Sequence, residues 1–302
     1  MQVFYEGCYG LTPSLAGLIH LWKPVLLDIF KSILNLRKIL LILPICLLFS
    51  NGYSQDKVIQ VGEMLKYKVY FGFIPLGEVE FKINKTYTED KKEHITAKAQ
   101  IKSLKDIPFV DVDYIFESVM VVDKQDDESR IYSEKFNSSE FQKKAIHATA
   151  YDFNYKERFI QVTKDVDGMN VEEFTKVSID SNTYFQDGLS LFYDARLHSF
   201  SNKNYNIPVY INEQISSVKY SFNINKDIVS VGQIDYDISA VKIAGVADFI
   251  GVFGLTGEFV GWLSDDEARI PIKANFNVQI GSISLELYSY KRTGWNPPRF
   301  EK

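Results

Sequence analysis

Cysteine and histidine are scarce in this sequence, and their scarcity excludes several kinds of site. Its 302 residues include two cysteines, Cys8 and Cys46, and four histidines. Both cysteines precede residue 55, so the chain beyond that point has no thiol for a disulfide or a thiolate metal site. The later histidines lie in different predicted elements, without the spacing of metal ligands. The sequence has no His-Glu-x-x-His, Gly-x-Ser-x-Gly or phosphate-binding glycine loop, so we expect no metal and no cofactor.

Long apolar runs are also missing, and the clearest apolar stretch is short. Arg37 and Lys38 precede eleven apolar residues, Ile39–Phe49, and a polar piece with small residues ends at Ser54. Eleven helical residues span roughly 16 Å, against about 30 Å of bilayer hydrocarbon. This order is typical of a secretory signal. We predict that residues 1–54 are an N-terminal extension plus a signal peptide cleaved after Ser54, and that the protein is exported to the periplasm or the outer-membrane periphery.

Three alternatives for this segment remain. Lipid attachment at Cys46 is disfavoured because Ile45 precedes it, where a small residue is expected. An uncleaved anchor over 11–34 is disfavoured by the charges inside that stretch. A translation start near Leu34 or Leu36 would leave a signal of about 20 residues.

Basic residues are outnumbered in the rest of the chain. Of 34 Lys+Arg and 39 Asp+Glu, four basic and two acidic residues lie in 1–54, which leaves 30 and 37 and a net charge of −7. An acidic domain is a poor candidate for binding nucleic acid or anionic lipid head groups by charge. We expect no nucleic-acid partner and at most a peripheral association with membranes.

Aromatic residues are abundant, at 14% of the chain, and favour strands. Apolar and polar residues alternate in four clear stretches, each indicating a strand with one buried face: 65–71, 79–83, 95–102 and 218–224. One stretch differs, since Leu189, Phe192 and Ala195 recur at helical spacing after Asp187, which can cap a helix. We predict a mainly β protein: one large antiparallel curved sheet, or an open or closed β-barrel, with one short helix packed on or in it.

The β-rich domain is expected over 55–290, followed by a loose C-terminal tail, 291–302. Several motifs within this domain resemble domain-of-unknown-function family 3108 (DUF3108), and they are Gly62–Tyr67, Pro75–Glu78, Phe116–Ser118, Leu191–Arg196, Gly261–Ile272 and Ile280–Ile283. The resemblance spans 62 to about 290 and implies an exported bacterial protein with a β-rich fold. It implies no activity.

Two polar features are candidate sites. Asp265, Asp266 and Glu267 are close enough in sequence to bind calcium or to act as an acid–base pair. The alternative is a charged turn between two strands, which we favour because Asp stabilises turns. Arg196, on the predicted helix, either points inward to pair with a carboxylate such as Glu117 or lies in solvent.

Apolar residues in predicted loops are the candidate ligand site. Phe73, Ile74 and Leu76 lie at a hairpin tip, and Phe249 and Phe253 lie in a glycine-rich loop. Hairpin tips are normally polar, so these residues either complete the core or form a rim that binds an apolar ligand.

Three functions are compatible with these features. The first is a non-catalytic envelope protein that binds a lipid or other apolar small molecule. The second is a structural or assembly factor that docks another envelope protein. The third is a hydrolase of envelope material that uses the acidic cluster. We favour a function without catalysis.

Overall fold

The computed structural model describes residues 57–301, except 106, 108–110, 126–127, 144, 171–174 and 279–280. The expected signal segment and both cysteines lie outside the described residues. In the described part of the chain, no helix is both long and apolar enough to cross a membrane.

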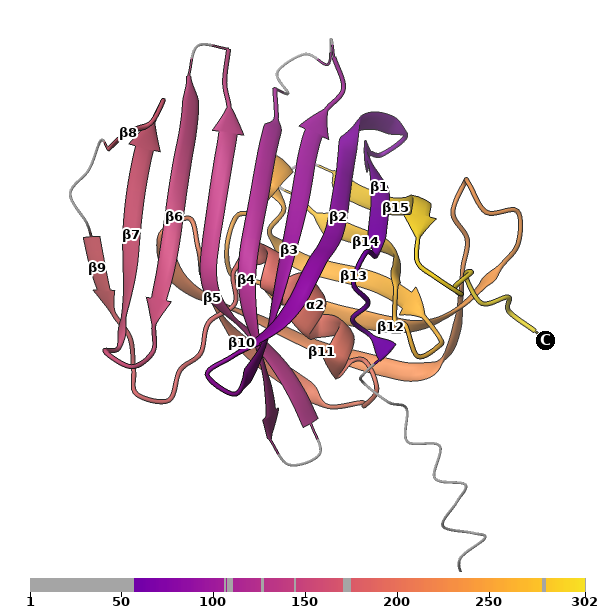
Figure 1. Cartoon of the computed structure of the whole chain (residues 1–302). Helices are drawn as coiled ribbons and strands as arrows, with labels where there is room; N and C mark the ends of the chain where they lie inside the picture. The colour runs from indigo at the N-terminus through magenta and orange to yellow at the C-terminus, as the bar shows by residue number, and fades with distance from the viewer. Residues whose placement is uncertain are drawn as a thin grey trace, which may run out of the picture. The chain divides into compact units, whose positions relative to one another are not determined.

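One antiparallel sheet dominates the molecule, as the alternating pattern predicted (Figure 1). Consecutive strands are neighbours from β1 to β8 and from β10 to β15, and β15 pairs with β1. The strands are β1 (Met64–Phe71), β2 (Ile74–Glu89), β3 (Lys92–Ser103), β4 (Asp113–Gln125), β5 (Glu128–Phe141), β6 (Ile146–Asn154), β7 (Phe159–Val166), β8 (Met169–Asn170), β9 (Thr175–Ser178), β10 (Asn204–Ile211), β11 (Gln214–Val229), β12 (Ile238–Ala247), β13 (Gly257–Ser264), β14 (Pro271–Asn277) and β15 (Ser282–Lys291).

The sheet curls without closing on itself. Its end strands are β10 on one side and β8 and β9 on the other. Tyr210 and Pro208 of β10 instead exchange backbone hydrogen bonds with Gln186, and Ser133 of β5 donates to Phe185. The segment before the helix therefore links the edge strand β10 to the interior strand β5, and the fold is an open barrel.

Alternation places the core inside this curl. In β1, Leu65 and Val69 are fully buried while Lys66 and Lys68 are partly exposed. The helix α2 (Gly188–His198) packs against β3, β4, β5 and β10. Between the two halves of the sheet in Figure 1, it brings the ring of Phe192 onto that of Phe81, with centroids 4.0 Å apart. Helix side chains thus occupy the interior of the open barrel.

The segment after β15 is not the loose tail that the sequence suggested. Phe300 donates its N–H to Asp237 O, and Ser239 donates to Pro298 O. The indole of Trp295 donates to Asp266 at 2.7 Å. Two prolines and several charges favoured a free end, but these hydrogen bonds attach the segment to the start of β12 and to the β13–β14 turn.

Candidate functional site

Asp187 caps the start of α2, as the sequence predicted. This carboxylate is buried, and so are Leu189 and Ser190 in the first turn of the helix. Asp187 accepts the N–H groups of Leu189 and Ser190, and Ser118 and Ser133 donate their hydroxyls to it from β4 and β5. Burial raises the pKa of Asp187, although these four hydrogen bonds act to lower it. The cap fixes the helix to the sheet, because two of its four donors come from strands.

A second carboxylate holds the middle of the helix. Asp194 accepts the backbone N–H of Ile131 at 2.8 Å, which joins α2 to β5. Burial raises the pKa of Asp194, while His198, 3.7 Å away, acts to lower it. Both carboxylates with a raised pKa are therefore enclosed in contacts between helix and sheet.

Arg196 is fully buried and makes five hydrogen bonds. Its Nη1 donates to Glu63 Oε1 at 2.6 Å and its Nη2 to Glu63 Oε2 at 3.1 Å. The remaining bonds go to backbone carbonyls of Val58, Ala268 and Arg269. Burial works against the charge of Arg196, but the attraction and hydrogen bonds of Glu63 outweigh it and raise the pKa of the guanidinium.

The expected pairing of Arg196 with Glu117 is wrong. Glu117 has 53% of its side chain exposed and lies 3.3 Å from Lys98. On β4, Glu117 alternates with the buried Ser118, so its side chain points to the outer face. Glu63, by contrast, is in phase with the inward-facing Leu65, and this periodicity was the available indication that it is buried.

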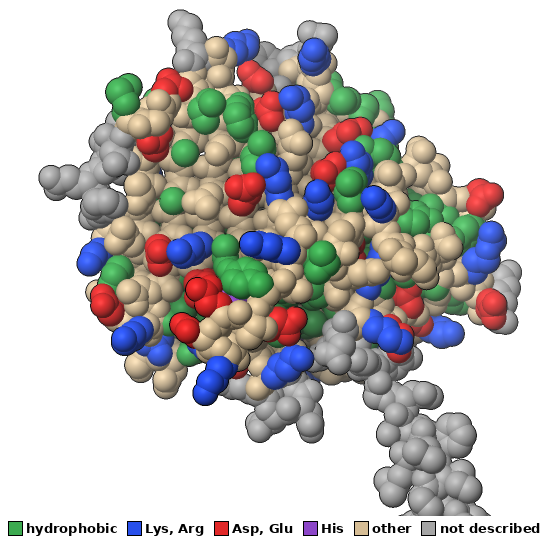
Figure 2. Space-filling view, viewed as in Figure 1, with side chains coloured by type: hydrophobic (Ala, Val, Ile, Leu, Met, Phe, Trp, Pro, Cys, Tyr) green, Lys and Arg blue, Asp and Glu red, His purple; other side chains and the backbone are tan. Residues whose placement is uncertain are grey.

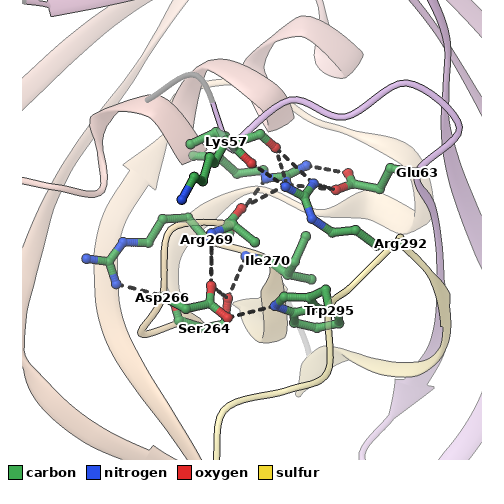
Figure 3. Close-up of polar contacts among 11 residues, drawn as sticks. Lys57, Glu63, Ser264, Asp266, Arg269, Ile270, Arg292 and Trp295 are labelled. Carbon is green, nitrogen blue, oxygen red and sulfur yellow. Dashed lines mark hydrogen bonds and ion pairs between the residues drawn. The ribbon is translucent and has the colours of Figure 1, made fainter. Parts of the chain in front are cut away.

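Arg292 completes what we name the Arg196 cluster: Glu63, Arg196 and Arg292. Figure 3 shows Arg292 pointing toward Glu63. Arg292 donates to the second oxygen of Glu63, and also to the carbonyls of Lys57 and Val58. Burial lowers the pKa of Arg292, against the opposing attraction of Glu63. The cluster joins the segment before β1, the helix and the segment after β15, so its geometry indicates a structural role.

The acidic residues form the turn between β13 and β14, and their carboxylates are occupied there. Asp266 accepts hydrogen bonds from Ser264 Oγ and the N–H groups of Ala268 and Arg269 through Oδ1, and from Trp295 through Oδ2 (Figure 3). Asp265 pairs with Arg269 at 3.0 Å.

Glu267 contacts Lys57 at 2.5 Å. In the part of the chain that the structure describes, no three acidic, histidine or cysteine side chains are grouped to hold a metal ion. The contacts of the acidic turn are those of a structural element that attaches the C-terminal segment.

The apolar loop residues separate into two groups. Phe73 is 91% exposed and Ile74 44% exposed, at the β1–β2 tip. Leu76 and Phe249 are partly buried and pack against two different core clusters. The side chain of Phe253 lies outside the described residues. The structure thus places Phe73 and Ile74 outward and turns Leu76 and Phe249 toward the core.

Phe73 and Ile74 belong to a larger set that the sequence did not reveal. We name it the apolar rim, and its exposed members are Phe73, Ile74, Leu104, Phe141, Ile146 and Met169. These are six of the twelve exposed large hydrophobic side chains of the described residues, and all lie at connections that follow β1, β3, β5 and β7. Because neighbouring strands are antiparallel, these four connections share one end of the sheet, at the top in Figure 1.

The rim is held in place by hydrogen bonds between adjacent tips. Leu104 donates its N–H to Leu76 O, and Asp167 donates to Ile146 O. Ile146 in return donates its N–H to Asp167 Oδ1 at 2.8 Å. Figure 2 shows hydrophobic side chains near this upper edge, with lysines and carboxylates among them and over the rest of the face. The rim is therefore part of the ordered sheet.

Comparisons with known structures give weak similarities. A β-barrel-like protein of domain of unknown function DUF1849 from Brucella abortus is 9% identical with a TM-score of 0.46, over 78% of this chain and 98% of that one. A protein from Bacteroides fragilis, assigned as exported and with a YmcC-like fold, is 9% identical with a TM-score of 0.32, over 77% of this chain and 97% of that one.

A protein from Parabacteroides distasonis, assigned as a lipoprotein, is 10% identical with a TM-score of 0.29, over 77% of this chain and 96% of that one. No curated protein matches the sequence. The model of the family described as "Protein of unknown function (DUF3108)" matches residues 66–288, which include every strand from β2 to β14, and the chain therefore belongs to the DUF3108 family.

Proposed function

We propose that the protein is a non-catalytic component of the cell envelope that docks an apolar partner through the apolar rim. The supporting observation is the exposure of six large hydrophobic side chains at one end of the sheet, where turns are normally polar. Exposed apolar side chains gathered in this way are typical of interaction sites. We place the protein in the periplasm or at the outer-membrane periphery.

The interior of the open barrel supports external docking over an enclosed ligand. Phe81 and Phe192 stack inside the curl, and Tyr193 beside them is fully buried. Among the carboxylates considered for a hydrolase, Asp266 accepts hydrogen bonds from Ser264 and Trp295. Asp265 pairs with Arg269, and Glu267 pairs with Lys57.

Photo-crosslinking tests the docking function. Benzoylphenylalanine replaces Phe73 in one variant and Lys156 in a matched control. Lys156 is exposed at the β6–β7 tip, which lies at the opposite end of the sheet. In the cells that make the protein, we expect an adduct with lipid or protein at position 73 and none at position 156. If no adduct forms at position 73 either, docking through the rim is refuted.

A further inference from the structure

We infer that the partner of the apolar rim is a zwitterionic lipid surface, an inference that rests on the proposed docking function. The first argument is the shape of the rim. Its members come from successive tips between β1 and β8, so they follow one another along one end of the curled sheet. With roughly 4.8 Å between strands, the six intervals from β1 to β7 amount to about 29 Å when followed along the curl of the sheet. A row of this kind matches the plane of a membrane better than a compact protein interface with a central core.

The second argument is the mixture of charges beside the apolar side chains. Lys105 follows Leu104, and Lys143 lies two residues after Phe141. Both lysines are exposed, and the described residues include no carboxylate paired with either. Asp167 is exposed at the neighbouring tip. A phosphatidylethanolamine head group carries a phosphate that can pair with lysine and an ammonium that can pair with aspartate. The head group therefore complements the positive and the negative side chains of the rim.

The third argument concerns the faces that stay in water. On the outside of the sheet, lysines and glutamates pair across strands, as Lys66 does with Glu80 at 2.7 Å and Lys273 with Glu286 at 2.6 Å. Charged side chains are unfavourable in hydrocarbon. The strands therefore remain hydrated, and only the tips enter the interface. The net charge of −7 beyond residue 54 opposes approach to a strongly anionic surface.

Vesicle flotation of the protein, expressed from its full sequence and purified as the cell processes it, tests the inference. The probes are vesicles of phosphatidylcholine with phosphatidylethanolamine, and vesicles rich in phosphatidylglycerol. We expect binding to the zwitterionic vesicles at least as strong as to the anionic ones. Because burial of apolar groups drives it, binding should change less than twofold between 0.1 and 0.5 M salt.

Two variants separate the rim from the rest of the surface. Phe73→Asp should reduce binding to zwitterionic vesicles at least tenfold, whereas Lys156→Glu at the opposite end should change it less than twofold. A double change, Phe73→Ser with Met169→Ser, checks that loss of apolar contact alone gives the same reduction.

Three results would overturn the inference: no binding of the parent protein to zwitterionic vesicles, stronger binding to anionic than to zwitterionic vesicles, or full binding by Phe73→Asp. The docking function fails separately. If a crosslink forms at position 73 while zwitterionic vesicles are not bound, the lipid inference is wrong and docking through the rim stands.

Discussion

Arg196 and Phe73 lie at opposite extremes of exposure. Arginine side chains are usually exposed and phenylalanine side chains usually buried, and here the reverse holds for both residues. The guanidinium of Arg196 is 0% exposed, while the ring of Phe73 is 91% exposed. Each nitrogen of the Arg196 guanidinium has a hydrogen-bond partner within the fold, because Glu63 and three backbone carbonyls surround it. The ring of Phe73, by contrast, is almost entirely exposed to solvent.

The comparison separates structural roles from functional ones. A buried charge with a complete set of partners is explained by the fold, since it joins the helix to both ends of the domain. An exposed apolar residue such as Phe73 is not explained by the fold, because the β2–β3 and β6–β7 tips at the other end of the same sheet expose Asp90, Lys91 and Lys156 instead. We therefore expect changes in the Arg196 cluster to alter stability and changes in the apolar rim to alter docking.

The largest effect is expected from Arg196→Met. The change leaves Glu63 buried with Arg292 as its remaining partner, and it removes the Arg196 donor from the carbonyls of Ala268 and Arg269, while Val58 O keeps Arg292. Breaking a buried ion pair by removing one partner typically destabilises by 3–5 kcal/mol, and we expect a loss of about 3 kcal/mol or more. Urea unfolding measures it. Arg196→Lys, which keeps the charge, is the control, and a loss below about 1 kcal/mol for Arg196→Met would contradict the structural role.

Asp187→Ala should have the next largest effect. It removes the helix cap and the acceptor for Ser118 and Ser133, so we expect a loss of about 2 kcal/mol in the free energy of unfolding. Asp187→Asn retains a capping oxygen and should lose less than half as much in the same assay. Equal losses for the two variants would show that the cap oxygen is unimportant.

The raised pKa of Asp187 predicts a dependence on pH of opposite sign to that of a paired surface carboxylate. Between its ordinary value of 3.8 and the raised value, the folded protein binds more protons than the unfolded chain. The contribution of Asp187 to stability therefore falls as pH rises through that range, by about 1.4 kcal/mol for each pH unit by which the pKa is raised. Unfolding of the parent and of Asp187→Asn from pH 7 to pH 4 should show the parent gaining relative to the variant. If the free energy of unfolding of the parent instead fell relative to that of Asp187→Asn toward pH 4, the predicted sign would be wrong.

The smallest effect on stability is expected in the rim. Phe73→Ser should change the free energy of unfolding by no more than about 0.5 kcal/mol, because surface substitutions away from special contacts are usually within that range. Leu76→Ser is a matched control on the same hairpin, since Leu76 packs against the core, and it should lose about 1–2 kcal/mol. If Phe73→Ser lost as much as Leu76→Ser, the rim would belong to the fold.

Local periodicity was enough to predict four of the strands, β1, β2, β3 and β11, and the helix with its cap at Asp187. The partner of Arg196 was not predictable in this way, because Glu63 lies 133 residues away in sequence and is brought near only when the sheet curls. Extending the alternation back from Leu65 would have placed Glu63 on the inner face.

The apolar rim shows the same limit. Phe73 and Ile74 stand out in sequence because they lie at a hairpin tip, where polar residues are expected. Leu104, Phe141 and Met169 occur singly among polar residues, and only the order of the strands places them at one end. Side-chain packing likewise decided that Leu76 and Phe249 turn toward the core while Phe73 does not.

Fluorescence of a single attached dye tests most directly whether the apolar rim contacts lipid. Residues 55–302 contain no cysteine, so with Cys8 and Cys46 replaced by serine one introduced cysteine labels one position. An environment-sensitive dye is attached at Phe73→Cys or, as the control, at Lys156→Cys, and zwitterionic vesicles are added. We predict a blue shift and increased emission at position 73 and no change at position 156. An equal response at the two positions, or none at position 73, would contradict docking of the rim on a lipid surface.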